Sequence, residues 1–425
     1  MRRVLLLIPS ATYRADAFLA AAERLGAEIV VGSNRAPALA SAGMLHVDYE
    51  DPEAGPQQIA AFAHDHPLNA ILAIDDQGVA LASRAARWLD LPHNPIDAVL
   101  ATRNKLNLRR RLAAAGLASP EHLAAVIRDD PTVLAERAPY PCVLKPLALS
   151  GSRGVIRADN PPTFVAAFER IRALLSDPEI AAECGDAAAG VLIEEFIPGT
   201  EVALEGLLEH GDLQLLALFD KPDPLDGPYF EETIYVTPSR LPQKEQETIT
   251  ATAARAAHAL GLHSGPVHIE LRINEDGIWP IDLAARTIGG HCARALTFAG
   301  GTSLEELVLR QALDETPNVE RDPLASGVMM IPIPGEGILQ AVHGVDEARA
   351  VPLIREVLIT VPAGRRLVPL PDGGEYPGFI FARGETPGAV EVALRRAHAA
   401  LTFELDTSGA ASMPPPAERS RPSSP

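Results

Sequence analysis

One predicted hairpin carries two carboxylates at a spacing that could bind a metal ion. Apolar and polar side chains alternate without a break over residues 267–274, which predicts a strand with one buried face. A three-residue loop at 275–277, with Gly277 in a left-handed conformation, would return the chain as a second strand. This register predicts that Glu270 lies directly opposite Asp282, where paired side chains start only about 5 Å apart.

Two carboxylates placed in this way repel each other unless a cation lies between them. Hard oxygen ligands from two carboxylates suit Mg²⁺, which keeps several waters and takes its other ligands from substrate phosphates. Arg286 follows Asp282 by four residues and is a planar cation that could hold a phosphoryl group during transfer. We interpret the hairpin as a metal-nucleotide site. The alternative is an ordinary exposed hairpin whose acids face water, and the presence of a nucleotide cradle elsewhere decides between them.

A glycine-containing loop provides a candidate cradle for phosphates. Residues 141–147 and 155–158 are predicted strands, and Ser150-Gly151-Ser152-Arg153-Gly154 joins them. Small residues let backbone N–H groups approach an anion closely, and Lys145 near the end of the first strand would add a point charge. The loop is not a Walker motif, because no Gly-Lys-Ser/Thr opens a helix. Taken alone, such a hairpin is more often structural.

Residues 101–120 predict a short helix that ends at Gly116 and has a basic face. Lys105 lies near its start. The alternative for this run of cations is a solvated helix face. The run contains Arg103, Lys105, Arg109, Arg110 and Arg111.

A strand edge between residues 191 and 220 could bind the adenine and ribose of a nucleotide. The sequence predicts a strand, a break at Pro198-Gly199, and then a hairpin that turns at residues 209–212. Glu201, Glu205 and their alternating neighbours share one face of the second strand. The alternative is a half-exposed antiparallel sheet. Residues 220–242, which follow, are rich in proline and aspartate and predict a long ordered loop of a kind that is often functional.

Residues 1–100 alternate short apolar runs with helical patterns, which predicts a small parallel sheet with helices on its faces. There is no G-x-G-x-x-G after the first strand, so a dinucleotide-binding fold has little support. Asp75 and Asp76 end a strand at a position where ligands of open sheets often bind, but helix capping is the favoured role. The predicted strands are 4–9, 27–32 and 69–75, and the predicted helices are 14–25, 56–65 and 77–89.

Length and composition limit the classes of protein that remain. A chain of 425 residues predicts two to three domains. The formal net charge of -19 argues against nucleic acid or an anionic membrane surface as the main partner. No apolar stretch approaches the roughly 20 residues of a membrane span. The three cysteines are scattered without metal-binding spacing, so a reduced cytoplasm is the simplest location.

Together these motifs resemble the ATP-grasp superfamily over roughly residues 100–312. The resemblance rests on the lysine of TRNK, the VLKPLALSGSRGV hairpin, the EEFIPGTE segment and the HIEL and IDLAAR strands. The HIEL and DLAAR combination, with the KPDPLDGPYF loop, looks most like the L-amino acid ligase group of carboxylate-amine ligases. The resemblance implies an α/β (α+β) ATP-grasp fold. Its domains would be an N-terminal pre-grasp domain at 1–100, the ATP-grasp domain at 101–325, a C-terminal lid subdomain at 326–407 and a disordered tail at 408–425.

The resemblance also implies a role for each matching residue, with ATP and Mg²⁺ as cofactors. Arg286 would steady the transferring phosphoryl group, and His268 would contact substrate or an acyl phosphate, although as a lone histidine it could equally be structural. Glu270 and Asp282 would bind Mg²⁺. The implied nucleotide contacts are Lys105 and Lys145 with the phosphates, Ser150, Gly151, Ser152, Arg153 and Gly154 as the closing loop, Glu194, Glu195, Phe196 and Ile197 at the adenine, and Glu201 at the ribose.

The chain departs from the family pattern at two positions. The usual glutamate at the second metal position is Asp282, which is one carbon shorter. The usual asparagine two residues later is Ala284, which removes a ligand for a second Mg²⁺. This alanine is typical of the amino acid ligase branch, so it favours that assignment.

The resemblance implies an ATP-dependent carboxylate-amine ligase that forms an amide bond through an acyl phosphate, with an amino acid substrate. The expected partners are small carboxylates and amines, with a homodimer as the default assembly. One alternative is a biotin carboxylase-like or purine-pathway member of the superfamily, although TIGGHCAR stands where the bicarbonate-binding motif of biotin carboxylases is expected. The other alternative is a nucleotide-binding scaffold without activity.

Overall fold

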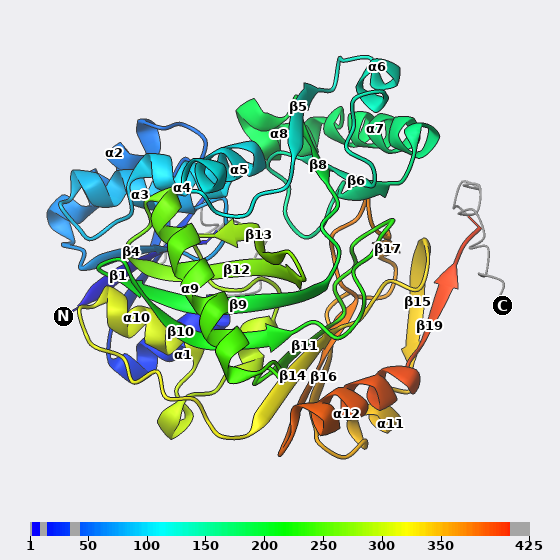
Figure 1. Ribbon diagram of the computed structural model, residues 1–425. Coiled ribbons are helices and arrows are strands. Elements are labelled where there is room, and N and C mark those ends of the chain that lie inside the picture. The colour runs from blue at the N-terminus through cyan, green and yellow to red at the C-terminus, as the bar shows by residue number, and fades with distance from the viewer. Residues whose placement is uncertain (1, 9–14, 35–42, 409–425) are drawn as a thin grey trace.

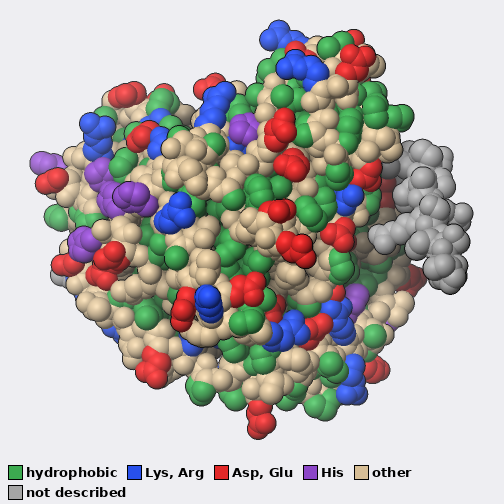
Figure 2. Space-filling view, viewed as in Figure 1, with side chains coloured by type: hydrophobic (Ala, Val, Ile, Leu, Met, Phe, Trp, Pro, Cys, Tyr) green, Lys and Arg blue, Asp and Glu red, His purple; other side chains and the backbone are tan. Residues whose placement is uncertain are grey.

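The computed structural model describes residues 2–8, 15–34 and 43–408 of the chain. The tail predicted to be disordered lies outside these residues from position 409 onward. The chain builds three regions around a central sheet, and Figure 1 shows the N-terminal region at the upper left, a small lobe at the upper right and the C-terminal strands at the lower right. Figure 2 shows acidic, basic and hydrophobic side chains interspersed over the visible face.

The N-terminal region is a parallel sheet, as predicted, with the strand order β3-β2-β1-β4, in which β3 was not predicted. Leu5 and Leu7 of β1 are fully buried against α2 and α3, whereas Val4 and Leu6 face the opposite side. Both faces are therefore covered, which explains the continuous apolar runs. The elements are β1 (Arg3–Leu7), α1 (Ala15–Leu25), β2 (Glu28–Ser33), β3 (Met44–His46), α2 (Ala54–Asp65), β4 (Ala70–Ala73) and α3 (Val79–Trp88).

Two short helices connect this region to the rest of the chain. The first, α4 (Ile96–Thr102), was not predicted, and the second, α5 (Lys105–Ala114), is the predicted basic helix. The side chain of Asn104 caps α5 by accepting a hydrogen bond from the backbone N–H of Asn107. This cap places Lys105 in the first turn of the helix.

The small lobe is a four-stranded antiparallel sheet in the order β5-β8-β6-β7, covered by helices on one face. Phe164 and Phe168 of α7 are fully buried against this sheet. The elements are β5 (His122–Val126), α6 (Pro131–Ala135), β6 (Cys142–Pro146), β7 (Ile156–Ala158), α7 (Pro161–Leu175), α8 (Pro178–Cys184) and β8 (Gly190–Glu195).

The central sheet has eight strands in the order β13-β12-β9-β10-β11-β14-β18-β16. Its first half is built from consecutive antiparallel pairs, as predicted for the two hairpins. The strands and helices of this half are β9 (Thr200–Glu209), β10 (Asp212–Asp220), β11 (Ile234–Thr237), α9 (Gln243–Leu260), β12 (Gly265–Asn274), β13 (Gly277–Ala284) and α10 (Leu304–Ala312).

Alternating residues of β9 face different layers, as the two-residue period of a strand requires. Val202, Leu204 and Leu208 pack against α9, which lies in front of the sheet in Figure 1. Ala203 and Leu207 instead face α1 and α10. The second face also carries Glu201, Glu205 and their partners on β12, so it is the face that positions the candidate site.

The C-terminal strands extend the central sheet, because β14 pairs with β11. The predicted boundary at residue 325 therefore falls at the start of a strand within the sheet, and the division into domains stays a prediction. A separate three-stranded sheet in the order β17-β15-β19 lies beside it. The elements are β14 (Ala325–Met330), β15 (Gly337–His343), α11 (Val345–Arg349), β16 (Ile354–Ile359), β17 (Arg366–Leu367), β18 (Gly378–Gly384), α12 (Pro387–Ala399) and β19 (Thr402–Asp406). No helix of the described residues is long and apolar enough to cross a bilayer.

Candidate active site

The hairpin of β12 and β13 places Glu270 opposite Asp282, as predicted, but the turn and the pairing next to it differ from the prediction. The predicted three-residue loop was wrong, because Asn274 already pairs with Gly277, which leaves a two-residue turn. Gly277 has a φ of 141°, so the positive φ expected there is present. A register shift between Glu270 and Leu271 adds one residue on β13 and brings the two carboxylates back into register.

Cross-strand neighbours on β9 and β12 form a line of charged groups on one face of the sheet. Arg272 lies opposite Glu201, and its Nε donates to a carboxylate oxygen of Glu201 over 2.8 Å. His268 lies opposite Glu205, with 3.2 Å between its Nδ1 and the carboxylate. Side chains at directly paired positions start close together. The pairing of β9 with β12 therefore determines which charged groups are neighbours on this face.

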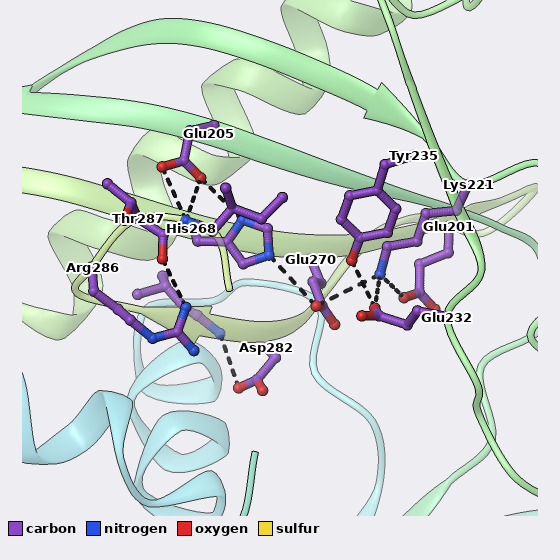
Figure 3. Close-up of polar contacts among 12 residues, drawn as sticks. Glu201, Glu205, Lys221, Glu232, Tyr235, His268, Glu270, Asp282, Arg286 and Thr287 are labelled. Atoms are coloured by element: carbon purple, nitrogen blue, oxygen red, sulfur yellow. Dashed lines mark hydrogen bonds and ion pairs between the residues drawn. The ribbon is translucent and has the colours of Figure 1, made fainter. Parts of the chain in front are cut away.

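Three acids converge around one lysine beside this line. Carboxylate oxygens of Glu201, Glu232 and Glu270 all lie within 4.8 Å of one another. The Nζ of Lys221 is 2.8 Å from Glu201 and 3.6 Å from Glu270, and it also contacts Glu232 (Figure 3). Burial would raise the pKa of Glu270, but the charge of Lys221 and the hydrogen bond from His268 lower it well below its ordinary value. Glu270 is therefore held as a carboxylate before any metal ion is bound.

His268 lies between two carboxylates and is nearly fully buried. Its Nδ1 faces Glu205, and its Nε2 is 3.6 Å from Glu270. Burial alone would lower the pKa of His268, but the hydrogen bonds to Glu205 and Glu270 raise it to about 9. A pKa raised by neighbouring carboxylates favours the charged imidazole, which suits contact with an anionic group.

Arg286 is fixed by partners on two elements. One guanidinium nitrogen donates to the backbone oxygen of Thr287 over 2.9 Å, and another donates to Asp76 over 2.7 Å. The sequence interpretation favoured a helix-capping role for Asp76, and this was wrong. The residue before α3 is Gly78, and Asp76 instead joins the N-terminal sheet to the arginine of the central sheet.

The two predicted phosphate lysines line one pocket between the small lobe and the central sheet, together with Glu270 and Asp282. The Nζ of Lys105 is 2.8 Å from the backbone oxygen of Leu149 and 3.9 Å from Asp282. Lys145 contacts Glu194. The structure therefore brings together both lysines and both predicted metal ligands, which lie far apart in the sequence.

Glu194, which the resemblance places at the adenine, has a buried side chain that pairs with two cations. Its side chain is 2% exposed and accepts hydrogen bonds from Arg109 at 2.7 and 3.2 Å as well as contacting Lys145. Burial would raise the pKa of Glu194, but the charges of Arg109 and Lys145 lower it to about 2. The interpretation of Arg109 as part of a solvated basic face was wrong, because this residue is 1% exposed.

The remaining predicted nucleotide residues divide between the pocket and its surroundings. Ser150, Gly151 and Ser152 line the pocket, whereas Arg153 contacts Glu183 and the N–H of Gly154 donates to the backbone oxygen of Pro371 over 2.8 Å. The pocket is also lined by Glu195, Phe196, Ile197 and Glu201. Both carboxylate oxygens of Glu201 already accept hydrogen bonds from Lys221 and Arg272. The nucleotide contacts of all these residues stay predictions.

Sequence reasoning missed Lys221, Glu232 and Tyr235. Glu232 lines the pocket, and its carboxylate contacts the side chains of the other two. All three lie within residues 220–242, which were predicted to be one long loop: Lys221 is the first residue after β10, Glu232 precedes β11, and Tyr235 lies in β11, a strand that was not predicted. The composition of that loop indicated a functional segment, but only the folded chain shows which of its residues turn inward.

The donor atoms present fit Mg²⁺. Glu270 and Asp282 offer carboxylate oxygens from directly paired positions, and side chains of both line the pocket beside the lysines. Two carboxylates with phosphate oxygens and water form the ligand set that Mg²⁺ takes in nucleotide sites. These residues would hold the ion, and the number of ions stays open because Ala284, opposite His268, offers no side-chain ligand.

Comparison with known families shows three matches along the chain. Residues 19–93 match the ATP-grasp N-terminal domain, residues 138–295 match the ATP-grasp domain, and residues 329–406 match the L-amino acid ligase C-terminal domain 2. Alanine-anticapsin ligase of Bacillus subtilis (strain 168) is 26% identical over 280 residues, which are 62% of this chain and 58% of that relative. The chain therefore spans less than two thirds of the length of this curated relative.

Solved structures show the same fold. The L-amino acid ligase from Bacillus licheniformis has a TM-score of 0.78 and 24% sequence identity, and the likeness covers 96% of this chain and 99% of that one. Carboxyaminoimidazole ribonucleotide synthase from Aspergillus clavatus, complexed with ATP, has a TM-score of 0.69 and 18% identity, with coverage of 94% and 98%. In this order along the chain, the family matches identify ATP-grasp domains followed by a C-terminal domain like that of the L-amino acid ligases, and the solved structures share the ATP-grasp fold.

Proposed function

We propose that the protein is an ATP-dependent carboxylate-amine ligase that activates its acid substrate as an acyl phosphate. The observation that carries this proposal is the meeting of Glu270, Asp282, Lys105 and Lys145 at one pocket, with Arg286 four residues beyond Asp282. Support also comes from the similarity to alanine-anticapsin ligase, whose name describes the joining of alanine to a second compound. An amino acid is the proposed substrate class.

The chemistry requires activation, because a free carboxylate has no adequate leaving group for attack by an amine. A carboxylate oxygen would attack the γ-phosphorus of ATP, the bond to the β-phosphate oxygen would break, and ADP would leave. The deprotonated amine would then attack the acyl carbon, and inorganic phosphate would leave with the bonding electrons. Lys105, Lys145 and Arg286 would orient and neutralise the phosphate oxygens at fixed positions, which is most of what catalysis of phosphoryl transfer needs.

A Mg²⁺ ion held by Glu270 and Asp282 would supply further charge neutralisation at the phosphates. Glu270 would be ready to bind the ion as a carboxylate, since Lys221 and His268 lower its pKa. The loop at 150–152 would cover the phosphates and exclude water, which protects an acyl phosphate from hydrolysis. A homodimeric assembly and a cytoplasmic location also stay predictions.

The direct test is ADP release from MgATP over pairs of amino acids and amines, with mass spectrometry of the products. The proposal expects ADP release that depends on both partners and an amide product of matching mass. Turnover with bicarbonate and biotin would instead identify a carboxylase. Nucleotide binding without turnover on any pair would identify a scaffold, and either result would contradict the proposal.

Replacing Glu270 by glutamine is expected to lower kcat/KM at fixed Mg²⁺ by at least about 100-fold, because the neutral amide is a poor ligand for a hard cation. Titration calorimetry of ADP with and without Mg²⁺ checks the cause without turnover, since only the Mg²⁺-dependent part of ADP affinity should fall. Glu275→Gln, at an exposed position in the turn of the same hairpin, is the matched control. Equal loss of ADP affinity with and without Mg²⁺ would contradict the assigned role.

A further inference from the structure

Residues 368–376, which we call the C-terminal segment, follow β17 and lie directly against the glycine loop of the small lobe. The backbone N–H of Gly154 donates to the backbone oxygen of Pro371 over 2.8 Å. Gly374 is so close to the loop that a Cβ atom there would lie 2.7 Å from the side chain of Arg153. Figure 1 shows this part of the chain, in orange near β17, reaching the underside of the small lobe. The C-terminal region therefore touches the loop that we expect to cover the phosphates.

The nucleotide pocket and the C-terminal segment are separated by the glycine loop alone at one point. Gly151 lines the pocket that contains Lys145 and Glu270, and it also lines a smaller cavity between the glycine loop and the C-terminal segment. Gly374 and Tyr376 line the other side of that cavity. A movement of the small lobe away from the C-terminal segment would therefore change the wall of the nucleotide pocket.

One ion pair joins α7 of the small lobe to the C-terminal segment. Nε and Nη2 of Arg170 donate to the two carboxylate oxygens of Asp372, over 3.0 and 2.7 Å. This bidentate geometry fixes orientation as well as distance. The third guanidinium nitrogen donates to the hydroxyl of Tyr229 over 2.9 Å, and the guanidinium carbon lies 5.4 Å from the centre of that ring. Arg170 thus joins α7 both to the C-terminal segment and to the loop before β11.

The small lobe has a hydrophobic core of its own, and the C-terminal segment is not part of it. Among the described residues, all members of this core lie between Leu123 and Ile193. The Arg170–Asp372 pair and the bond from Gly154 are polar contacts. Polar groups can exchange such contacts for water when a lobe moves, whereas the separation of a shared apolar core would expose it. This arrangement permits the small lobe to open and close as a unit.

The proposed reaction needs a closed and an open state. An acyl phosphate must be kept from water until the amine attacks, and ADP must leave afterwards. We propose that Arg170 and Asp372 form a latch that keeps the small lobe closed over the phosphates by tying it to the C-terminal segment. Both are positioning residues, since neither lines the nucleotide pocket. Protection of the acyl phosphate by the latch rests on the proposed function, whereas retention of the nucleotide requires only that the pocket binds ATP.

Asp372→Asn and Arg170→Met should each increase the rate constant for dissociation of a fluorescent ADP by about three- to tenfold. Stopped-flow displacement in the presence of Mg²⁺ measures this rate with the full chain. The range is that of a charge-assisted pair whose side chains, Arg170 and Asp372, are 25% and 39% exposed. If the two residues act through each other, the double variant should release ADP no faster than the faster single variant.

The matched controls remove a similar side chain that does not join the lobe to the C-terminal segment. Arg128→Met replaces an exposed arginine of the small lobe. Asp346→Asn replaces an acid whose partner, Arg349, lies on the same helix, α11. Both controls should release ADP at the wild-type rate. An ADP dissociation rate that Asp372→Asn and Arg170→Met leave unchanged would overturn the latch, even if ligase activity is found.

A second measurement tests the protection of the acyl phosphate. With an acid and an amine substrate present, the latch variants should release more ADP per amide formed than the wild type, because a lobe that opens early admits water to the intermediate. A ratio of ADP to amide equal to that of the wild type would overturn this protective role. Faster ADP dissociation in the latch variants, without amide formation by the wild type on any pair, would support the latch and contradict the proposed function.

Discussion

Replacing Arg286 by methionine should lower kcat by about 10³-fold or more, while KM for ATP changes only a few-fold. An arginine that neutralises charge on a transferring phosphoryl group contributes this much in comparable sites, because its effect is greatest in the transition state. The structure adds that the guanidinium is already oriented by Thr287 and Asp76, at 2.9 and 2.7 Å. Single-turnover measurement of ADP formation separates this effect from product release.

The controls for Arg286 distinguish a lost charge from a damaged fold. Arg294→Met removes an arginine whose partner is Glu356 on the surface and should leave kcat within about twofold. Arg286→Lys keeps the charge but loses the planar fork, so it should recover only part of the activity. Arg286→Met alone leaves the carboxylate of Asp76 without its arginine. The double variant Asp76→Asn with Arg286→Met also removes that negative charge, so it separates the loss of the arginine from the effect of an unpaired carboxylate. Wild-type kcat in Arg286→Met would contradict the assigned role.

Replacing Glu194 by glutamine should lower the free energy of unfolding by about 3–5 kcal/mol at pH 7, because it leaves two buried cations without their shared carboxylate. Arg109 and Lys145 both lose this partner, and the side chains of all three are less than a tenth exposed. Urea unfolding measures the change. Glu169→Gln removes the half-exposed partner of Arg172 and should cost less than about 1 kcal/mol.

The contribution of Glu194 should also depend on pH in a defined direction. Its pKa is about 2 in the folded protein, against an ordinary value of 4.5. A lowered carboxyl pKa means that the stabilisation is complete above the unfolded value and is lost as the pH falls through the folded one. The difference between wild type and Glu194→Gln should therefore be constant from pH 8 to about 5 and shrink from about pH 4.5 downward. A difference that grows with acidity would contradict the ion-paired state.

Local pattern was sufficient for the elements that build the site. The alternation at 267–274 predicted the strand that carries Glu270, and the apolar runs of the first 100 residues predicted the parallel sheet. Even so, the turn was one residue shorter than predicted. Glu270 still pairs with Asp282, because a bulge on β13 adds the residue that the shorter turn lacks. Burial of one face of the hairpin against α9 favours this register, since a shift by one residue would expose the apolar side chains.

The charge partners of the site could not be predicted in the same way. Arg286 and Asp76 are 210 positions apart, and Arg109 and Glu194 are 85 positions apart. A run of basic residues looks the same in sequence whether its members face water or a buried acid. Arg109 and its neighbour Arg110 show this, since one is buried and the other is exposed.

The sequence by itself predicted most of the strands and helices, the hairpin carboxylates and the glycine loop, because helices and strands each have a fixed period that the side-chain pattern follows. The tertiary structure alone decided that Lys221 enters the acid cluster, that Asp76 holds Arg286, and that the C-terminal strands join the central sheet. These contacts depend on how whole layers pack, and packing brings together charges whose separation along the chain carries no local signal.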